Sequence, residues 1–296
     1  MPELLPVCPI CASNKLSNSF ECLDYTVTRE TFVIQKCDSC SFLFTNPRPK
    51  IDEISKYYKS DTYISHTNSE KGILNKVYQA IRDRAIRKKV ELIESYGPLP
   101  KAILDYGCGT GEFLSKAKAA GWVSSGLEPD PDARKLAITN HDLKVGQLTD
   151  LQLFEKAQFG VITLWHVLEH VHSLQETIAQ FHRILSAEGV LIIAVPNCKA
   201  LDAQEYKSYW AAYDVPRHLY HFSREVMALL MEKNGFKIDS IQPMFFDPFY
   251  ISLLSEKYKS GWMNPVKAFL MGIKTTLKGK RNIDLNSSLV YVIKKK

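Results

Sequence analysis

Short apolar runs alternate with longer amphipathic stretches over the last two thirds of the chain. The runs have the length of buried strands, and they lie at residues 102–106, 123–128, 143–146, 160–165 and 190–195. The stretches between them carry apolar residues at the three- and four-residue spacing of helices, most clearly at residues 112–120. Strands that alternate with helices in this way predict a parallel, doubly wound α/β sheet.

Elements on either side extend the predicted domain. Residues 72–96 have the pattern of one long helix, which Gly97 and Pro98 end. Residues 236–242 and 288–294 have the pattern of two closing antiparallel strands. The chain is therefore predicted to divide into a module at residues 1–50, a connector with a helix at 51–98, and an α/β domain at 99–296 that carries a helical insertion near 247–284.

Three glycines follow the first predicted strand at alternate positions: Gly107, Gly109 and Gly111. Glycine adopts positive φ angles and has no Cβ, so such a turn lets a ligand lie against the backbone. An acid, Glu128, follows at the end of the second apolar run, where a carboxylate can accept two hydrogen bonds from a ribose diol. A glycine turn in an unrelated α/β protein is the alternative, but the strand, the helix and the distal acid together favour a nucleotide cofactor.

The pattern G-x-G-x-G, with an aspartate two residues before its first glycine, resembles class I S-adenosylmethionine (SAM) methyltransferases. The resemblance implies a Rossmann-like fold, with a mostly parallel seven-stranded sheet, helices on both faces, and a helix before the first strand that covers the cofactor. It also implies that SAM binds to Asp105, Gly107, Cys108, Gly109, Gly111, Glu128, Pro129, Gln147, Leu148 and His166. In this family His166 would lie beside the methionine part of SAM, and Gln147 with Leu148 beside the adenine.

Two further segments resemble the small-molecule, methyltransferase 23-like branch of this family. Residues 165–171 place Glu169 and His170 at the start of a helix, and residues 189–197 form a strand that ends in Pro-Asn. Glu169 and His170 can equally be a helix-capping and packing pair. One departure from the family pattern is Gly160, which stands where an aspartate is usual and removes an acid from the surroundings of the site.

Four of the seven cysteines form two C-x-x-C pairs, Cys8 with Cys11 and Cys37 with Cys40. Each pair can point both sulfurs at one centre, so the doubled motif predicts a structural Zn²⁺ ion held by four thiolates in a zinc-ribbon module. The gap between the pairs can hold a β-hairpin, and residues 26–36 have its alternating, β-branched pattern. A redox C-x-x-C is the rival interpretation, but the module lacks the βαβ context of that motif.

Aromatic and basic residues gather at residues 206–223, where methyltransferases of this fold hold their acceptor. The segment contains P-R-H-x-x-x-F-S, and this motif resembles a large branch of zinc-ribbon-bearing methyltransferases that includes sugar-modifying ones. His218 and His221 are the candidate bases that would take a proton from the acceptor. The candidate acceptor-binding residues are Trp210, Tyr213, Asp214, Arg217 and Tyr220. The aromatic side chains can instead pack a lid, Arg217 can hold Asp214, and Ser223 is expected to cap a helix at 224–234.

Composition places the chain among ordinary globular proteins, since 45% of its 296 residues are hydrophobic and 24% are charged. The N-terminus has no secretory signal pattern and no window is apolar enough to cross a membrane, so a cytoplasmic protein is expected. The formal net charge of +6 is spread along the chain, and nucleic acid is not an expected partner. Residues 264–278 mix lysines with apolar residues at helical spacing, which fits peripheral contact with a membrane or packing against the same domain.

The sequence thus predicts a SAM-dependent methyltransferase that acts on oxygen or carbon of a small-molecule, sugar or lipid-linked acceptor. One rival is an RNA or protein methyltransferase that docks its substrate on the zinc ribbon. Against it, the Asp/Asn-Pro-Pro-aromatic motif that clamps an exocyclic amine is absent, with Val-Pro-Asn at residues 195–197 in its place. The other rival is a non-catalytic scaffold that binds SAM. The intact glycine turn, the ribose acid and the polar acceptor segment favour an enzyme.

Overall fold

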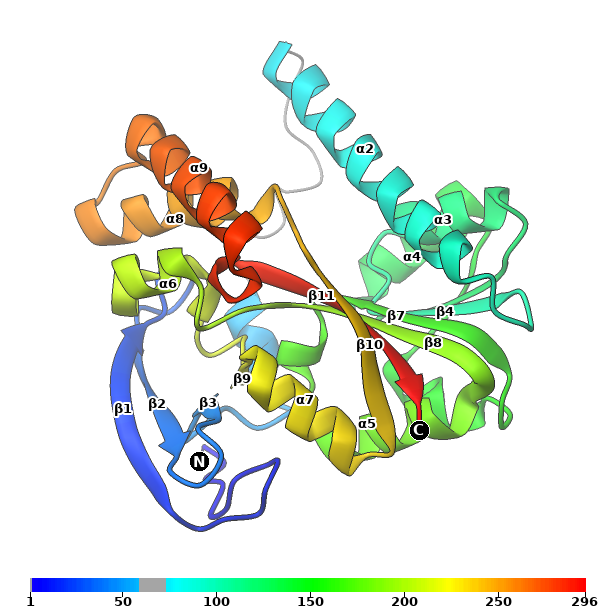
Figure 1. The fold of residues 1–296 in the computed structure, drawn as a ribbon, viewed down its shortest axis with the longest axis horizontal. Coiled ribbons are helices and arrows are strands. Elements are labelled where there is room, and N and C mark those ends of the chain that lie inside the picture. The colour runs from blue at the N-terminus through cyan, green and yellow to red at the C-terminus, as the bar shows by residue number, and fades with distance from the viewer. Residues whose placement is uncertain (1, 59–72) are drawn as a thin grey trace.

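A seven-stranded sheet lies at the centre of the computed structural model (Figure 1). The structure describes residues 2–58 and 73–296, and residues 59–72 of the predicted connector lie outside this description. The strands are β4 (Ala102–Tyr106), β5 (Val123–Leu127), β6 (Lys144–Gly146), β7 (Phe159–Trp165), β8 (Leu185–Pro196), β10 (Phe236–Pro243) and β11 (Ser288–Lys295). Every strand that the periodicity predicts in the α/β domain is therefore present.

The strand order across this sheet is β10-β11-β8-β7-β4-β5-β6. Strands β4 to β8 run parallel, and β11 pairs antiparallel with both β8 and β10. The order reverses between β4 and β7, because β5 follows β4 on one side and β8 follows β7 on the other. In an open α/β sheet, such a switch point opens a crevice for ligands at the carboxyl ends of the strands. The predicted Rossmann-like sheet is confirmed.

Helices cover both faces of the sheet, because neighbouring residues of a strand point into opposite cores. In β4, Ile103 packs in one core and Leu104 in the other. The first core is covered by α2 (Ile73–Tyr96), α3 (Glu112–Ala119) and α4 (Pro131–His141), and the second by α5 (Leu174–Ile184) and α7 (Arg224–Lys233). The oxygen of Ser223 accepts a hydrogen bond from the amide of Val226 and caps α7, as expected.

Short helices carry the chain over the carboxyl edge of the sheet. They are η1 (Ile54–Tyr58), η3 (Leu148–Leu153), η4 (Leu168–His170), α6 (Leu201–Tyr206), η5 (Lys207–Tyr209), η6 (Ala211–Tyr213) and η7 (Ile283–Leu285). Two of them, η3 and η4, follow β6 and β7 almost directly. Two more, η5 and η6, form part of the predicted acceptor segment. These turns place the polar residues of several chain segments above the same edge.

The N-terminal module is built on a second, four-stranded sheet, in the order β1-β2-β3-β9. Three strands are its own: β1 (Leu16–Leu23), β2 (Thr31–Cys37) and β3 (Leu43–Thr45). The predicted position of the hairpin at residues 26–36 is wrong in its first half, because residues 24–30 form the turn. The carboxylate of Asp24 accepts hydrogen bonds from the amides of Thr26, Val27 and Thr28, which holds these β-branched residues out of the ladder.

The fourth strand of this sheet, β9 (Tyr220–His221), belongs to the P-R-H-x-x-x-F-S segment. It pairs antiparallel with β3, so the N-terminal module and the α/β domain share one sheet. Arg217 strengthens this junction from a position that is 1% exposed. Its guanidinium binds Asp214 through both carboxylate oxygens, at 2.6 and 2.9 Å, and Asp24 of the module at 3.0 Å. It also donates to the carbonyl oxygen of Tyr57 at 2.8 Å.

The predicted insertion between β10 and β11 is a helical hairpin of α8 (Asp247–Ser260) and α9 (Pro265–Arg281) (Figure 1). The side chain of Asn264 caps α9 at the amide of Lys267, and Pro265 takes the first helical position, where its missing N–H costs nothing. None of the helices in the described ranges is long and apolar enough to cross a membrane.

Replacing Arg217 by Met should cost about 3–5 kcal/mol of unfolding free energy, because it leaves the buried carboxylate of Asp24 without its cation. The matched control is Arg224→Met, which removes a pair with Asp284 that is 43% and 28% exposed and should change stability by less than about 1 kcal/mol. Urea unfolding followed by fluorescence measures both. Equal losses in the two variants would show that the junction does not depend on Arg217.

Candidate functional site

The glycine turn after β4 adopts the left-handed conformation at all three predicted positions. The φ angles are +78° at Gly107, +55° at Gly109 and +86° at Gly111. A Cβ at Gly107 would lie 2.5 Å from Val167, and one at Gly111 would lie 2.6 Å from Leu143. No atom lies within 4 Å of the position that a Cβ at Gly109 would take. Packing therefore requires the outer two glycines, and the middle one leaves open space against the backbone.

The carboxylate of Glu128 is fixed beside this open space. One oxygen accepts the amide N–H of Gly109 at 2.8 Å, and the other accepts that of Asp130 at 2.9 Å. The side chain is buried, and burial raises its pKa. Because each carboxylate oxygen has a second lone pair, Glu128 can still accept one hydrogen bond at each oxygen. Two neighbouring hydroxyl groups would satisfy both.

A second buried acid, Asp105, lies at the end of β4. The hydroxyl of Thr163 donates to it at 2.6 Å, and burial raises the pKa of Asp105 to about 6. The charge of Lys89, from α2, opposes this rise. The ammonium of Lys89 also lies 4.2 Å from the centre of the Trp165 ring. Lys89 was not predicted from the sequence. It lies on a long helix, and the residues around it do not indicate that its side chain reaches the end of β4.

His166 follows β7 directly and lies between two acids. Its φ is +58°, and its ring reaches Asp247 at 3.0 Å through Nε2 and Glu169 at 3.4 Å through Nδ1. Burial by itself would lower the pKa of His166, but the two carboxylates raise it to about 10. His166 is therefore an imidazolium at neutral pH. Asp247 was not predicted as a site residue. The only sequence pattern near it is a proline at the start of a helix, which indicates the helix but not a contact with His166.

A buried carboxylate and two further histidines meet at the same strand end. One oxygen of Glu169 and one ring nitrogen each of His170 and His218 lie within 4.8 Å of one another, and we call these three residues the Glu169 cluster. Glu169 is 0% exposed, and neither of its oxygens makes a hydrogen bond within the described part of the chain. Although burial disfavours its charge, the neighbouring imidazolium of His166 lowers the pKa of Glu169. A charged carboxylate buried in this way is costly unless cations lie close to it.

The two histidines of the cluster have defined orientations. Nδ1 of His218 lies 2.8 Å from the carbonyl oxygen of Ala212, and since a carbonyl only accepts, this nitrogen carries the proton. Nδ1 of His170 lies 2.9 Å from the carbonyl oxygen of Arg217 and 2.9 Å from the hydroxyl of Tyr58. Burial lowers the pKa of His170 to about 4, so it stays neutral. Nε2 of His218 is left with a lone pair and no hydrogen-bond partner among the described residues.

The other predicted acceptor residues are buried in the protein itself. The indole of Trp210 donates to Asp202 at 3.0 Å, and the hydroxyl of Tyr220 donates to the carbonyl of His172 at 3.0 Å. Tyr213 packs edge-to-face against Trp210. His221 lies 3.3 Å from the hydroxyl of Thr45, and burial lowers its pKa to about 3. The structure brings His218 to the Glu169 cluster and places His221 in the sheet shared with the module. Asp214 and Arg217 pair with each other, the alternative that the sequence had left open.

The remaining predicted cofactor residues line the same edge of the sheet. Pro129 and Gln147 are exposed after β5 and β6, and Leu148 is half-buried beside them. The amide of Gln147 donates to Asp150 at 2.9 Å. Cys108 is buried under the glycine turn, where its sulfur would lie 2.7 Å from a Cβ at Gly126. Loops that follow β4, β5, β6 and β7 therefore meet at the carboxyl edge of the sheet, where the strand order predicts a ligand crevice.

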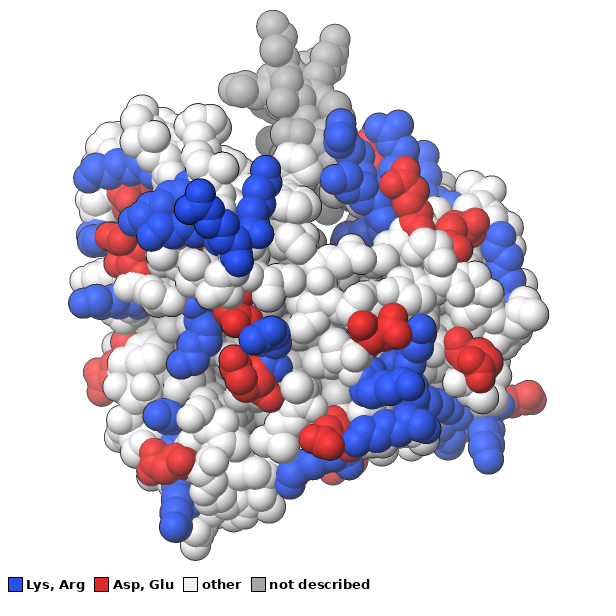
Figure 2. All heavy atoms as spheres, in the orientation of Figure 1, with Lys and Arg blue, Asp and Glu red and all other residues white. Residues whose placement is uncertain are grey.

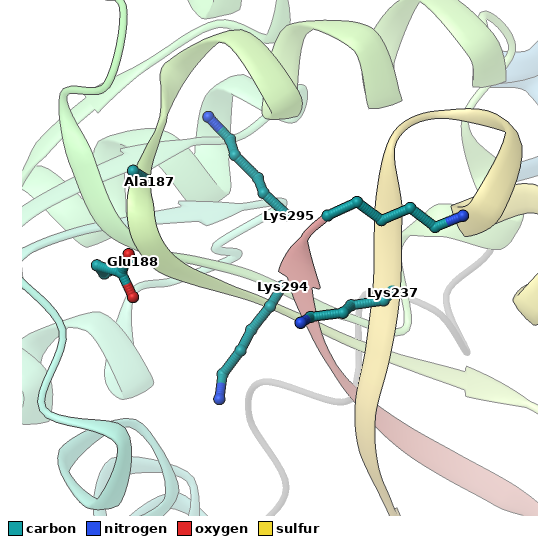
Figure 3. Close-up of a pocket in the computed structure, with 6 residues that line it drawn as sticks. Ala187, Glu188, Lys237, Lys294 and Lys295 are labelled. Atoms are coloured by element: carbon teal, nitrogen blue, oxygen red, sulfur yellow. The ribbon is translucent and has the colours of Figure 1, made fainter.

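A separate pocket of about 360 Å³ lies at the opposite edge of the sheet (Figure 3). It is lined by Ala187, Glu188, Lys237, Lys294, Lys295 and Lys296. Lys294 pairs with Asp239 at 2.9 Å and Lys296 with Glu232 at 3.1 Å. The start of β8 and the end of β11 form this edge, so the pocket is remote from the glycine turn and the Glu169 cluster.

The four cysteines of the two C-x-x-C pairs meet in the N-terminal module. Their sulfurs lie within 4.8 Å of one another, with 3.6 Å between Cys8 and Cys40 and 3.5 Å between Cys11 and Cys37. A disulfide would bring two sulfurs to about 2.05 Å. Four sulfurs around a tetrahedral zinc, each about 2.3 Å from the metal, lie about 3.8 Å apart. The arrangement fits a metal better than a disulfide.

A family model described as a methyltransferase domain matches residues 78–241, more than half of the chain. The chain belongs to the class I SAM-dependent methyltransferases. It is 24% identical to the ubiquinone biosynthesis O-methyltransferase of Rickettsia bellii (strain OSU 85-389) over 213 residues, which are 66% of this methyltransferase and 85% of that protein. The predicted enzyme class and methyl donor are thereby confirmed.

Solved structures share the fold of this methyltransferase. The magnesium protoporphyrin IX methyltransferase of Synechocystis PCC 6803, with bound S-adenosylhomocysteine (SAH), is similar with a TM-score of 0.53 and 13% identity, over 82% of this chain and 98% of that one. A SAM-dependent methyltransferase from Archaeoglobus fulgidus is similar with a TM-score of 0.50 and 19% identity, over 72% and 94% of the two chains. At this identity the likeness concerns the fold alone.

Proposed function

We propose that this methyltransferase transfers a methyl group to oxygen or carbon of a small-molecule, sugar or lipid-linked acceptor, with His218 as the base. The observation that carries the proposal is the Glu169 cluster, in which a buried carboxylate lies beside a histidine with a free ring nitrogen. The name of the Rickettsia relative, an O-methyltransferase of ubiquinone biosynthesis, supports a small-molecule acceptor. His221 is not part of this proposal, because its ring is enclosed between the module and the aromatic segment.

His218 has the tautomer that a base requires. The carbonyl of Ala212 holds the proton on Nδ1, so Nε2 can take a proton from a hydroxyl or an acidic carbon of the acceptor. As the acceptor atom bonds to the methyl carbon, the carbon–sulfur bond of the donor breaks and its electron pair stays on sulfur. The imidazolium that forms on His218 lies within 4.8 Å of the carboxylate of Glu169, which stabilises it. His170 packs edge-to-face on this ring at 4.6 Å between centroids and holds its orientation.

SAM is proposed to lie in the crevice above the glycine turn. Gly109 leaves room for the methionine part against the backbone, and the carboxylate of Glu128 accepts the two ribose hydroxyls. Pro129, Gln147 and Leu148 would lie beside the adenine, at the ends of β5 and β6. His166, as an imidazolium, would attract the methionine carboxylate. Asp105 and Cys108 support the turn from below.

Zinc is proposed as the structural metal of the N-terminal module, bound by Cys8, Cys11, Cys37 and Cys40. The distances between their sulfurs support this assignment, and the amide of Ile10 lies 3.5 Å from the sulfur of Cys8, as in many thiolate sites. The shared strand β9 and the buried Arg217 make the module a structural partner of the α/β domain. This supports a scaffolding role for the zinc over docking of RNA or protein.

Glu128→Gln should weaken SAH binding by about 1.5–3 kcal/mol, a factor of roughly 10 to 150, because an amide cannot replace a charged acceptor for two hydroxyls. Isothermal titration calorimetry measures the affinity. Glu188→Gln is the matched control, since that acid is exposed at the opposite edge of the sheet and should leave binding unchanged. Parental affinity in Glu128→Gln would contradict the ribose assignment.

One tightly bound zinc per chain is expected in protein purified under reducing conditions. Plasma mass spectrometry gives the metal content, and Cys37→Ser should lose both the metal and cooperative unfolding of the module, since binding of a structural zinc contributes folding free energy. Cys198→Ser, which alters a cysteine outside the cluster, is the control and should keep its zinc. A metal-free parent protein would argue for a redox or packing role.

His218→Ala should lower kcat by roughly 100-fold or more, the usual contribution of a general base, while SAH affinity stays at the parental value. The acceptor is first identified by mass spectrometry of native-host extracts incubated with methyl-labelled SAM, and kcat and KM are then measured with it. His141→Ala, at the far end of α4, is the control and should keep full activity. A raised KM with an unchanged kcat would instead make His218 an acceptor-binding residue, and an unchanged rate would refute both roles.

A further inference from the structure

Helix α9 buries a stripe of small residues and exposes several large apolar residues. The buried face consists of Ala268, Gly272, Thr275 and Gly279, which recur at helical spacing. A Cβ at Gly272 would overlap the ring of Phe249 on α8, so the two helices pack too closely for a larger residue. Two large side chains of α9 still pack against the protein, because Met271 contacts the core below and the ring of Phe269 lies 5.7 Å from that of Phe249. The other large apolar side chains, Val266, Leu270 and Leu277, point away from the stripe of small residues and are available for another contact.

The exposed face of α9 continues into the turn before it. Val266, Phe269, Leu270 and Leu277 are 66%, 59%, 60% and 57% exposed, and in the turn Trp262 is 59% and Met263 44% exposed. Residues 266, 270 and 277 recur at helical spacing on the side away from the buried stripe. We call these six side chains the apolar face. Scattered single exposed apolar residues are ordinary, but a contiguous set of this size indicates an interaction surface.

Basic residues flank the apolar face. Residues 257–281 contain seven lysines and arginines and no acid, although the formal net charge of the whole chain is only +6. Figure 2 shows Lys and Arg side chains gathered over α9, and Lys274 has an exposed partner in Glu205 at 3.6 Å. An apolar stripe with lysines beside it, and an aromatic residue at one end, is the pattern of helices that lie in a membrane interface.

We propose that the α8–α9 hairpin docks on the surface of a bilayer that contains anionic lipids. The apolar face would enter the boundary between head groups and acyl chains, while the lysines meet lipid phosphates. Charge complementarity selects this occupant over a second copy of the chain, because two such faces brought together would oppose their lysines. The proposal concerns a surface outside the methyl-transfer site and does not depend on the identity of the acceptor.

The hairpin also connects this surface to the site. Asp247, the first residue of α8, binds His166 at 3.0 Å beside the glycine turn. A bilayer against α9 would therefore be separated from the crevice at the carboxyl edge of the sheet only by the α8–α9 hairpin. An acceptor with a lipid tail could remain in the membrane while its polar end reaches His218.

Co-sedimentation of the full-length protein with vesicles tests the proposal. We expect binding to phosphatidylcholine vesicles that contain roughly one third phosphatidylglycerol, weaker binding to pure phosphatidylcholine, and loss of part of the binding in high salt. Phe269→Ser with Leu270→Ser should lower the partition coefficient on anionic vesicles roughly tenfold or more. Ile51→Ser with Leu99→Ser, which removes two apolar side chains elsewhere that are 70% and 75% exposed, should bind like the parent.

A charge control separates this surface from the lysine-lined pocket at the other edge. Lys267→Gln with Lys278→Gln should weaken binding to anionic vesicles several-fold, whereas Lys237→Gln with Lys296→Gln should not. Equal binding of the apolar-face variant and the parent, or no vesicle binding by the parent, would overturn the proposal. If the parent does not bind vesicles but forms a dimer, and Phe269→Ser with Leu270→Ser abolishes that dimer, the occupant of the apolar face is a second copy of the chain. SAH affinity is measured in every variant and is expected to be unchanged. This measurement distinguishes a failure of the membrane proposal from a failure of the assignment of the methyl-transfer site.

Discussion

The buried guanidinium of Arg217 joins three separate parts of this methyltransferase. Asp24 comes from the N-terminal module, Tyr57 from the connector and Asp214 from the predicted acceptor segment, and all three contact the same side chain. A cation removed from water costs several kcal/mol unless paired, so these partners must be assembled for the chain to fold. His218 is the next residue, and the amide of Leu219 donates to the carbonyl of Glu169 at 2.8 Å. The network that docks the module therefore also places His218 beside the end of β7.

Charge balance connects this architecture to the chemistry. The buried carboxylate of Glu169 and the half-buried carboxylate of Asp247 lie on either side of one imidazolium, His166, and the charge of Lys89 acts on Asp247 as well. The sulfonium of SAM carries one positive charge, which disappears when the methyl group leaves. In the proposed reaction a positive charge appears on His218 at the same time, within reach of Glu169. The carboxylate of Glu169 would thus stabilise the protonated base after transfer.

The strands were predictable because each buried strand alternates between two cores, which imposes a visible period on the sequence. The glycine turn was predictable because its positive φ angles favour glycine, and the position of Glu128 was predictable because it directly follows the second apolar run. Lys89 and Asp247 were not, since each reaches the site from an element far away in the sequence and no local pattern marks it. Gly160, the departure from the family pattern, has a steric reason: a Cβ there would overlap the carbonyl oxygen of Pro100. The hairpin of the module was misplaced because the hydrogen bonds of Asp24 outweigh the β-branched preference of its neighbours.

The topology explains why an insertion can contribute to the site at all. Because β11 is antiparallel to both β8 and β10, β10 ends and β11 begins at the carboxyl edge, where Ser288 is paired with Pro196. A segment inserted between them must leave and re-enter the sheet beside the crevice. Its first helix then begins within reach of β7, which is how Asp247 meets His166. Its second helix packs on the first through a stripe of small residues, and Val266, Leu270 and Leu277 lie exposed on its other side. The strand order thus brings together two features that lie in different parts of one insertion: Asp247, which pairs with His166, and the exposed apolar residues of α9.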